Sequence, residues 1–168
     1  MRIDQLMIRS YLGDKELGIY AAVLPLAMIW TFIPMTLTTS LAPFIAKKKQ
    51  EGEDKYWYSL KNIFRLYALL GWIICLCVVI VAPFIVNLLF GNAYSHGVLV
   101  LQITVFTNLF INMGVAQSLW ILNEGKSKLA MYRTFLGAIV CIVSNIVLIP
   151  IYGIYGAAVS AVLAQIFS

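Results

Sequence analysis

The segment at residues 47–55, Lys-Lys-Lys-Gln-Glu-Gly-Glu-Asp-Lys, separates two long stretches of sequence that contain no charge. Residues 17–46 on one side and residues 66–122 on the other carry no Asp, Glu, Lys or Arg. About 20 apolar residues in a helix span the roughly 30 Å hydrocarbon core of a bilayer. The pattern therefore predicts membrane spans on both sides, joined by a polar loop at residues 47–62.

The composition of the whole chain agrees with this interpretation. Its 168 residues are 62% hydrophobic and 11% charged, with a mean hydropathy of +0.91. Soluble domains are about half apolar and about a quarter charged. The sequence therefore predicts an all-α, polytopic membrane helix bundle in a lipid bilayer. The net charge of +5 comes from basic residues that cluster in loops, so we expect no nucleic-acid partner.

Four apolar segments are long enough to cross a bilayer, and two shorter ones flank them. The predicted spans are residues 17–46, 63–90, 98–122 and 129–149. Residues 1–12 and 154–168 are too short to cross, and we expect them to be partial helices of a larger bundle. Pro25 and Pro34 should bend the first span, because each removes a backbone donor.

Lysine and arginine alternate between the predicted loops. The loop at residues 47–62, with its flanks, contains six of them, whereas the loop at residues 91–97 contains none. The loop at residues 123–128, with the start of the next span, contains three, and the loop at residues 150–153 contains none. Short loops rich in Lys and Arg stay in the cytoplasm. The alternation therefore predicts that loops 47–62 and 123–128 are cytoplasmic and that loops 91–97 and 150–153 are external.

Short motifs along the whole chain are similar to one family of membrane proteins. They lie at residues 3–8, 11–13, 17–22, 33–34, 41–43, 89–94 and 148–158. The last, Leu-Ile-Pro-Ile-Tyr-Gly-Ile-Tyr-Gly-Ala-Ala, is the most specific. In this order the motifs resemble the second half of the polysaccharide-biosynthesis (O-antigen) flippases, which belong to the multidrug/oligosaccharidyl-lipid/polysaccharide exporter superfamily.

The resemblance implies a fragment of the C-terminal lobe of a MATE-like flippase, whose partner would be a missing N-terminal lobe of the same parent chain. Such proteins are implied to move a polyprenyl-pyrophosphate-linked oligosaccharide across the bacterial cytoplasmic (inner) membrane by alternating access of the two lobes. Two alternatives stay open. One is a cation-coupled multidrug antiporter of the same superfamily, and the other is a truncated membrane protein that transports nothing.

Charged side chains near the start of the chain are candidates for a transport site. On a helical projection Arg2, Gln5 and Arg9 lie within about 60° of one another, whereas Asp4 points away. Charges inside a bilayer are costly and usually face a cavity or a partner. Guanidinium groups bind phosphate through paired hydrogen bonds, so the first three residues are substrate-binding candidates and Asp4 is an ion-coupling candidate. In the alternative, Arg9 lies at the outer headgroups and Arg2 pairs with a carboxylate of the missing lobe.

A second set of candidates lies in the third predicted span. Thr104, Asn108 and Asn112 recur every four residues and therefore share one helical face. Polar amides inside a membrane either line a wet cavity or join helices by hydrogen bonds. Asn108 and Asn112 are therefore cavity candidates, with contact between helices as the alternative.

The sequence offers no pattern typical of catalysis. His96 lies in a predicted turn without a nucleophile or carboxylate placed beside it, and no glycine-rich phosphate loop is present. Cys75, Cys77 and Cys141 fall within apolar spans and match no zinc or redox spacing. We therefore expect a protein that is not an enzyme and that needs no cofactor or metal.

Small residues recur at four-residue spacing in the last segment. The two rows are Gly153, Ala157 and Ala161, and Gly156, Ser160 and Ala164. Such rows let neighbouring helices approach closely, so they predict helix packing and not a binding site.

Overall fold

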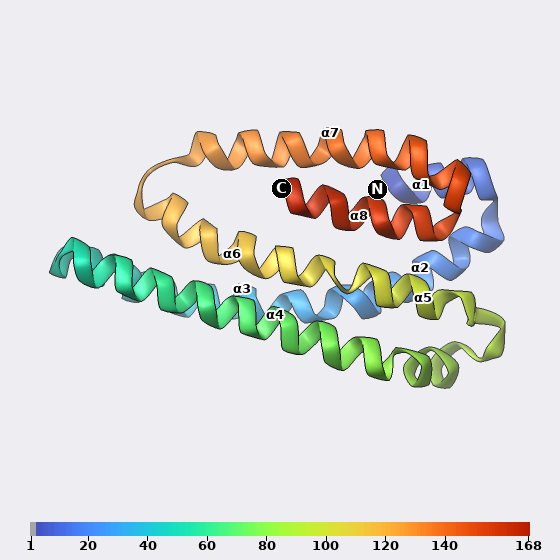
Figure 1. The fold of residues 1–168 in the computed structure, drawn as a ribbon, viewed down its shortest axis with the longest axis horizontal. Helices are drawn as coiled ribbons and strands as arrows, with labels where there is room; N and C mark the ends of the chain where they lie inside the picture. The colour runs from blue at the N-terminus through green and yellow to red at the C-terminus, as the bar shows by residue number, and fades with distance from the viewer. Residues whose placement is uncertain (1–2) are drawn as a thin grey trace.

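The computed structural model describes residues 3–168, and these residues form a bundle of eight α-helices and two short 3-10 helices (Figure 1). In chain order the elements are α1 (Ile3–Leu12), α2 (Asp14–Met28), η1 (Ile29–Thr31), α3 (Phe32–Glu51), α4 (Glu53–Phe90), η2 (Asn92–Tyr94), α5 (His96–Thr104), α6 (Thr107–Asn123), α7 (Ser127–Tyr152) and α8 (Ile154–Phe167). The shorter helices α1 and α8 correspond to the two predicted partial helices.

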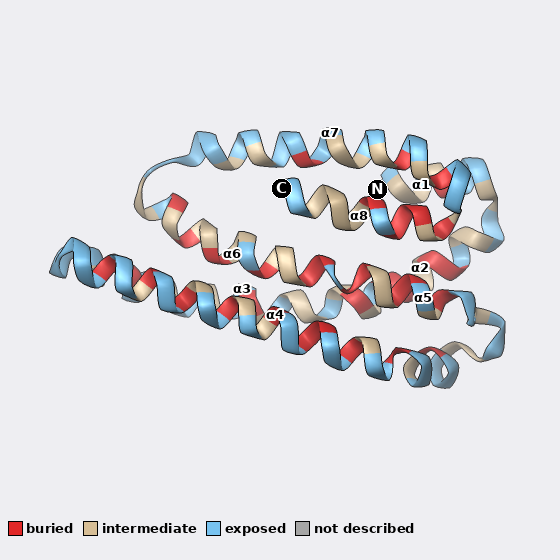
Figure 2. Cartoon of the chain, in the orientation of Figure 1, coloured by how far each residue is buried: buried red, intermediate tan, exposed pale blue. Residues whose placement is uncertain are grey.

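Four helical segments of the described chain are long and apolar enough to cross a membrane. They are Asp14–Glu51, Glu53–Phe90, His96–Asn123 and Ser127–Tyr152. The outward faces of α4 and α7 are exposed along most of their length (Figure 2), and large apolar side chains such as Ile80, which is 76% exposed, cover them. Apolar surface on this scale is suited to lipid and not to water. The chain is therefore an all-α polytopic membrane protein, as its composition predicts.

The first span is interrupted between its two central prolines. The 3-10 turn η1 joins α2 to α3, and Pro34, which has no N–H, cannot donate to the carbonyl of Trp30. The Pro34 carbonyl in turn accepts hydrogen bonds from the hydroxyls of Thr38 (2.9 Å) and Tyr67 (3.1 Å). The predicted disturbance at the prolines is therefore present, and it creates a polar contact between α3 and α4.

The predicted loop at residues 47–62 is wrong. Helix α3 continues through the lysines, α4 begins directly afterwards, and Gly52 alone separates the two helices. Its φ of 132° is one that residues with a side chain rarely adopt. Lys48 and Lys49 in the last turn of α3 complement the negative end of the helix dipole, and Glu53 complements the positive end of α4. Because these charges stabilise helix ends, the polar segment remains helical.

The third span contains a break that the sequence does not signal. Helix α5 ends at Thr104 and α6 begins at Thr107, so the predicted span at residues 98–122 is two helices. The Thr107 hydroxyl donates to the Thr104 carbonyl at 2.7 Å, and the Asn108 amide donates to the Val105 carbonyl at 3.2 Å. Side-chain donors of this kind compete with the helical pattern of backbone hydrogen bonds.

The boundaries of the fourth span and its neighbours are also corrected. Helix α7 runs through Pro150 to Tyr152, so the predicted turn at residues 150–153 consists of Gly153 alone. Inside a membrane bundle, neighbouring groups and local adjustments satisfy the backbone that a proline frees. Likewise, the predicted loop at residues 123–128 shortens to residues 124–126, and in the segment at residues 91–97 the 3-10 turn η2 precedes α5.

Buried apolar side chains form two cores. The larger core joins α1, α2, α4, α5, α7 and α8 around fully buried residues such as Tyr20, Val100 and Ile149. The smaller core joins only α3, α4 and α6, with Tyr56 and Tyr67 as its largest side chains. In Figure 1, α1, α2, α5 and α8 lie between α7 and α4 in one half of the bundle, whereas α6 lies between α7 and α4 in the other half.

Helices α7 and α8 pack closely through small residues. A Cβ atom added to Gly156 would lie 2.1 Å from the carbonyl oxygen of Leu148, so only glycine fits at this contact. Ala157, Ala158 and Ser160 are buried beside it. The predicted packing role of the small residues in α8 is therefore confirmed at this point.

Candidate functional site

One carboxylate lies within the membrane-spanning part of the bundle. Asp4 is near the start of α1, which lies well inside the length of the bundle and contacts α7 and α8 (Figure 1). The hydroxyl of Tyr20 on α2 donates to the Asp4 carboxylate at 3.0 Å, and the Tyr20 side chain is fully buried. The other acidic side chains lie beside the connections between helices. Since an ionisable group at this depth is costly unless it has a partner, the Asp4–Tyr20 pair is the first element of the candidate site.

Gln5 lies beside this pair in a groove between α1 and α2. The groove has a volume of about 510 Å³ and is lined by Gln5, Ala21, Leu24, Pro25, Met28 and Ile29. Pro25 has no N–H and cannot donate to the Ala21 carbonyl four residues earlier. The groove therefore combines mostly apolar walls with the amide of Gln5, and the proline beside it removes one backbone donor from α2.

Of the two candidate arginines, the structure describes only Arg9, and Arg9 does not line this groove. The Arg9 guanidinium lies 2.8 Å from the Asp14 carboxylate, at the junction of α1 and α2. Both side chains are mostly exposed, at 66% and 77%. Arg2 lies outside the described residues. The structure thus brings Asp4 and Gln5 to the contact between α1 and α2 and places Arg9 at the end of the helix, and a role for Arg9 in phosphate recognition stays a prediction.

The polar row of the third span is buried inside the bundle. The Asn108 amide donates to the Ala27 carbonyl at 2.7 Å, which joins α6 to α2. The Asn112 amide donates to the Asn108 carbonyl within α6, also at 2.7 Å. Within the part of the chain that the structure describes, the amide oxygens of both residues and the Thr104 hydroxyl are buried without a partner. Asn108 therefore makes the predicted contact between helices, and a cavity role for Asn108 and Asn112 remains a prediction.

At the lysine-rich end, an ion pair joins segments that are distant in sequence. The Lys49 ammonium lies 2.9 Å from the Glu124 carboxylate and also donates to the Asn123 carbonyl. The last turn of α3 is thereby fixed to the connection between α6 and α7. Hydrogen bonding and charge from Lys49 lower the pKa of Glu124 from its ordinary value of 4.5.

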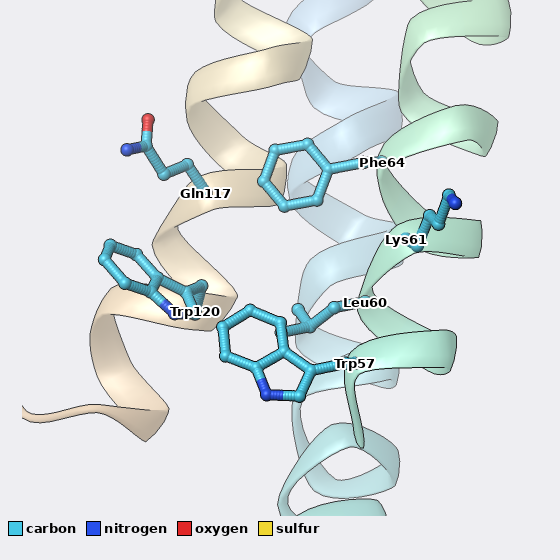
Figure 3. Close-up of a pocket in the computed structure, with 6 residues that line it drawn as sticks. All are labelled: Trp57, Leu60, Lys61, Phe64, Gln117 and Trp120. Carbon is cyan, nitrogen blue, oxygen red and sulfur yellow. The ribbon is translucent and has the colours of Figure 1, made fainter. Parts of the chain in front are cut away.

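A second groove, between α4 and α6, has no counterpart among the residues that the sequence indicates. It has a volume of about 700 Å³ and is lined by Trp57, Leu60, Lys61, Phe64, Gln117 and Trp120 (Figure 3). The Gln117 side chain also accepts a hydrogen bond from Arg133 on α7. In the sequence, Trp57 lies in the segment Lys55-Tyr56-Trp57-Tyr58, where aromatics beside positive charge are typical of a membrane interface. Only the packing of α4 on α6 shows that it shares a groove with Trp120.

A helical membrane bundle with interrupted helices and an ionisable group at membrane depth is typical of secondary transporters. The MatE family model matches residues 1–165, so the chain belongs to the MatE family. This agrees with the superfamily that the sequence motifs resemble.

Two curated relatives are similar to almost the whole chain. The capsular polysaccharide biosynthesis protein CapF of Staphylococcus aureus is 26% identical over an alignment of 168 positions. The alignment covers 97% of this chain and 41% of the relative. An uncharacterised membrane protein of Methanocaldococcus jannaschii is 24% identical over 164 residues, which cover 98% of this chain and 38% of the relative. The chain thus spans about two fifths of the length of these relatives. No solved structure matches the chain.

Proposed function

We propose that this chain is the C-terminal-lobe part of a MatE-family flippase that exports a lipid-linked oligosaccharide for surface polysaccharide assembly. The observation that carries the proposal is the similarity to CapF, which extends over 97% of the chain and whose name refers to capsular polysaccharide biosynthesis. The protein would lie in the bacterial cytoplasmic membrane with its lysine-rich end inside. It would act by alternating access of two lobes and not as an enzyme.

In this proposal different site residues bind the sugar, bind the pyrophosphate and couple transport to an ion. Gln5 can exchange hydrogen bonds with sugar hydroxyls in the groove between α1 and α2. Arg9, together with Arg2, would bind the pyrophosphate when Arg9 leaves its exposed pair with Asp14. Asp4 would couple transport to an ion, because its charge at membrane depth depends on what binds it.

The buried row on α6 has a separate role in the same proposal. Asn108 and Asn112 hold amide oxygens inside the bundle without a partner among the described residues. If the lobe opens during transport, the contact between Asn108 and the Ala27 carbonyl would separate. The freed amides would then line the cavity, which reconciles the two alternatives that the sequence leaves open.

A cation-coupled multidrug antiporter is the second candidate. Arginines that face a cavity would repel a cationic cargo. Among the described residues, however, Arg9 pairs with Asp14, and Asp4 accepts a hydrogen bond from Tyr20, which precedes the groove residue Ala21. A carboxylate at this position suits a cationic substrate, so this observation favours the antiporter.

The experiment that separates the two candidates uses cells that lack the gene and are complemented with variants of the full protein at equal abundance. Surface polysaccharide, retained lipid-linked oligosaccharide and accumulation of a cationic dye are measured together. Loss of the protein should abolish surface glycan and retain the lipid-linked precursor without changing dye accumulation. The opposite pattern would support the antiporter and contradict the flippase.

Variants of Arg9 then test its role. Arg9→Ala should slow export by about ten- to a hundredfold, because a charge-assisted hydrogen bond contributes roughly 1.5–3 kcal/mol. Arg9→Lys should restore only part of this loss, since lysine lacks the planar guanidinium. Lys15→Ala, which removes a basic side chain near the same junction, is the matched control. Export at the wild-type rate by Arg9→Ala would contradict a role of Arg9 in substrate binding. It would favour the alternative that Arg9 lies at the outer headgroups as an interfacial anchor.

A further inference from the structure

The groove between α4 and α6 combines apolar walls with a position near the end of the bundle. Trp57 and Phe64 project from α4, and Trp120 projects from α6 toward them (Figure 3). Trp57 and Trp120 lie about one turn from the ends of their helices, at the level where tryptophan usually meets lipid headgroups. The groove is open to the outside of the bundle, and Trp57 is half exposed. Its surface therefore suits an extended hydrocarbon chain.

The rim of the groove is positively charged. Lys61 lies at its edge with the ammonium directed away from Gln117 and Trp120 (Figure 3). On the other side, the Lys126 ammonium lies 4.6 Å from the centre of the Trp120 ring. Within the described part of the chain neither lysine forms an ion pair, and no carboxylate lines the groove.

Nearby acidic groups offset this charge only in part. Lysines outside the groove hold Glu51 and Glu124, and Glu53 and Asp54 in the first turn of α4 form no ion pair with either groove lysine among the described residues. Glu51 pairs with Lys48 at 2.8 Å, and Glu124 pairs with Lys49 at 2.9 Å. The rim is thus left with unpaired cations above an apolar wall. This arrangement is complementary in charge and polarity to a lipid that carries a net negative headgroup.

We propose that this groove binds one anionic glycerophospholipid from the leaflet at the lysine-rich end. One acyl chain would pack against Trp57, Phe64 and Trp120, while the phosphodiester lies between the ammonium groups of Lys61 and Lys126. Long lysine side chains reach from apolar surface to headgroup level, so both ammonium groups can approach the same phosphate. A zwitterionic lipid would bring its own ammonium toward these lysines and is disfavoured.

The bound lipid would contact both α4 and the segment between α6 and α7. The smaller core does not include that segment. The proposal does not depend on which cargo the exporter carries. It can therefore fail while the proposed function holds, and the reverse is also true.

The test measures quenching of tryptophan fluorescence by lipids with brominated acyl chains. The protein is placed in phosphatidylcholine nanodiscs after every tryptophan other than Trp57 and Trp120, including Trp30 and Trp72, is replaced by phenylalanine, so that the signal comes from the two groove tryptophans. Brominated phosphatidylglycerol should quench at a lower mole fraction than brominated phosphatidylcholine. Lys61→Gln and Lys126→Gln should each weaken the preference for phosphatidylglycerol about fivefold, the effect of one basic residue at an anionic lipid surface.

Lys47→Gln is the matched control, because Lys47 lies at the same end, is exposed and does not line the groove. Circular dichroism and elution volume establish that each variant remains folded. Unchanged preference in Lys47→Gln with loss in the two groove variants would support the site. Three results would each overturn the proposal. They are equal quenching by the two lipids, equal loss of the preference in all three variants, and no quenching by either lipid because protein covers the groove.

Discussion

The two ends of the bundle are held together by different interactions. At the packed end, where Gly13, Gly91 and Gly153 lie in the connections, most of the helices converge on the larger core (Figure 1). At the lysine-rich end, where Gly52 and Gly125 lie in the connections, only α3, α4 and α6 share a core. Other contacts at this end include ion pairs, cation–aromatic contacts and hydrogen bonds such as the one between Gln117 and Arg133.

This difference indicates which end resists change. Apolar packing with small residues leaves no room for repositioning, so the packed end should act as a fixed unit. Exposed ion pairs and open grooves rearrange at little cost, because surface ion pairs contribute little stability. Helix movements during transport are therefore expected at the lysine-rich end. Changes in packing should damage the first end most, and changes in charge should affect mainly the second, which holds three of the four ion pairs among the described residues.

The largest expected effect comes from filling the closest contact of the packed end. Gly156→Ala places a methyl group 2.1 Å from the backbone oxygen of Leu148, so α7 and α8 must separate. Overpacking of this kind costs about 1–3 kcal/mol. Thermal unfolding of the detergent-solubilised protein should show a correspondingly lower midpoint.

Gly18→Ala is the control for that substitution, because a Cβ atom at Gly18 in α2 would meet nothing within 4 Å. This variant should be as stable as the wild type or more stable by about 0.5–1 kcal/mol, the usual gain in a helix interior. Equal midpoints for the two variants would mean that the packed end is not closely packed.

A smaller effect is expected from the hydrogen bond between α6 and α2. Asn108→Ala removes the bond to the Ala27 carbonyl, whereas Asn112→Ala removes only a bond within α6. Hydrogen bonds between membrane helices contribute on average about 0.6 kcal/mol, so Asn108→Ala should be less stable than Asn112→Ala by about this amount. The difference in unfolding free energy between the two variants measures the contact. A difference of zero would show that Asn108 does not join the helices.

The smallest effect belongs to the ion pair of the lysine-rich end, and it depends on pH. Because Lys49 lowers the pKa of Glu124 in the folded state, the pair stabilises the fold fully above the ordinary pKa of 4.5. The contribution disappears as pH falls through the lowered pKa. Glu124→Gln should therefore unfold at a slightly lower temperature than wild type at pH 7 and at the same temperature in acid.

Glu53→Gln serves as the control for this pH dependence, since within the described residues Glu53 forms no ion pair. Its midpoint should differ from that of the wild type only through the loss of the Glu53 charge at the start of α4, because no ion pair is removed. A difference between Glu124→Gln and wild type that persists unchanged in acid would contradict the assignment of the lowered pKa to the Lys49 contact.

The spans could be predicted from the sequence because a bilayer imposes a minimum length on every apolar helix. The residues at which each span begins and ends could not be predicted in the same way. The lysines at residues 47–49 indicate a polar segment, but nothing local distinguishes a loop from a helix end whose charges complement its dipole. The break at Val105 and Phe106 contains neither glycine nor proline. It arises from side-chain hydrogen bonds, which become visible only in the structure.

The candidate site was predictable in its unusual residues and not in its partners. Asp4 stands out because charge is rare in an apolar segment, but the sequence does not indicate that Tyr20 donates to it. Asn108 stands out in the same way, whereas its acceptor at Ala27 lies 81 positions away. The α4–α6 groove depends on contact between helices that are distant in sequence, so the pattern of single residues could not reveal it.

The central claim is that the open, lysine-rich end faces the cytoplasm and the packed end faces outward. It is tested most directly by labelling intact cells with an impermeant thiol reagent, after the native cysteines, including Cys75, Cys77 and Cys141, are replaced. Gln50→Cys and Lys126→Cys probe the lysine-rich end, and Ser95→Cys and Tyr152→Cys probe the packed end; all four positions are exposed. Labelling from outside at Ser95→Cys and Tyr152→Cys alone is the predicted result. Labelling at Gln50→Cys would contradict the account.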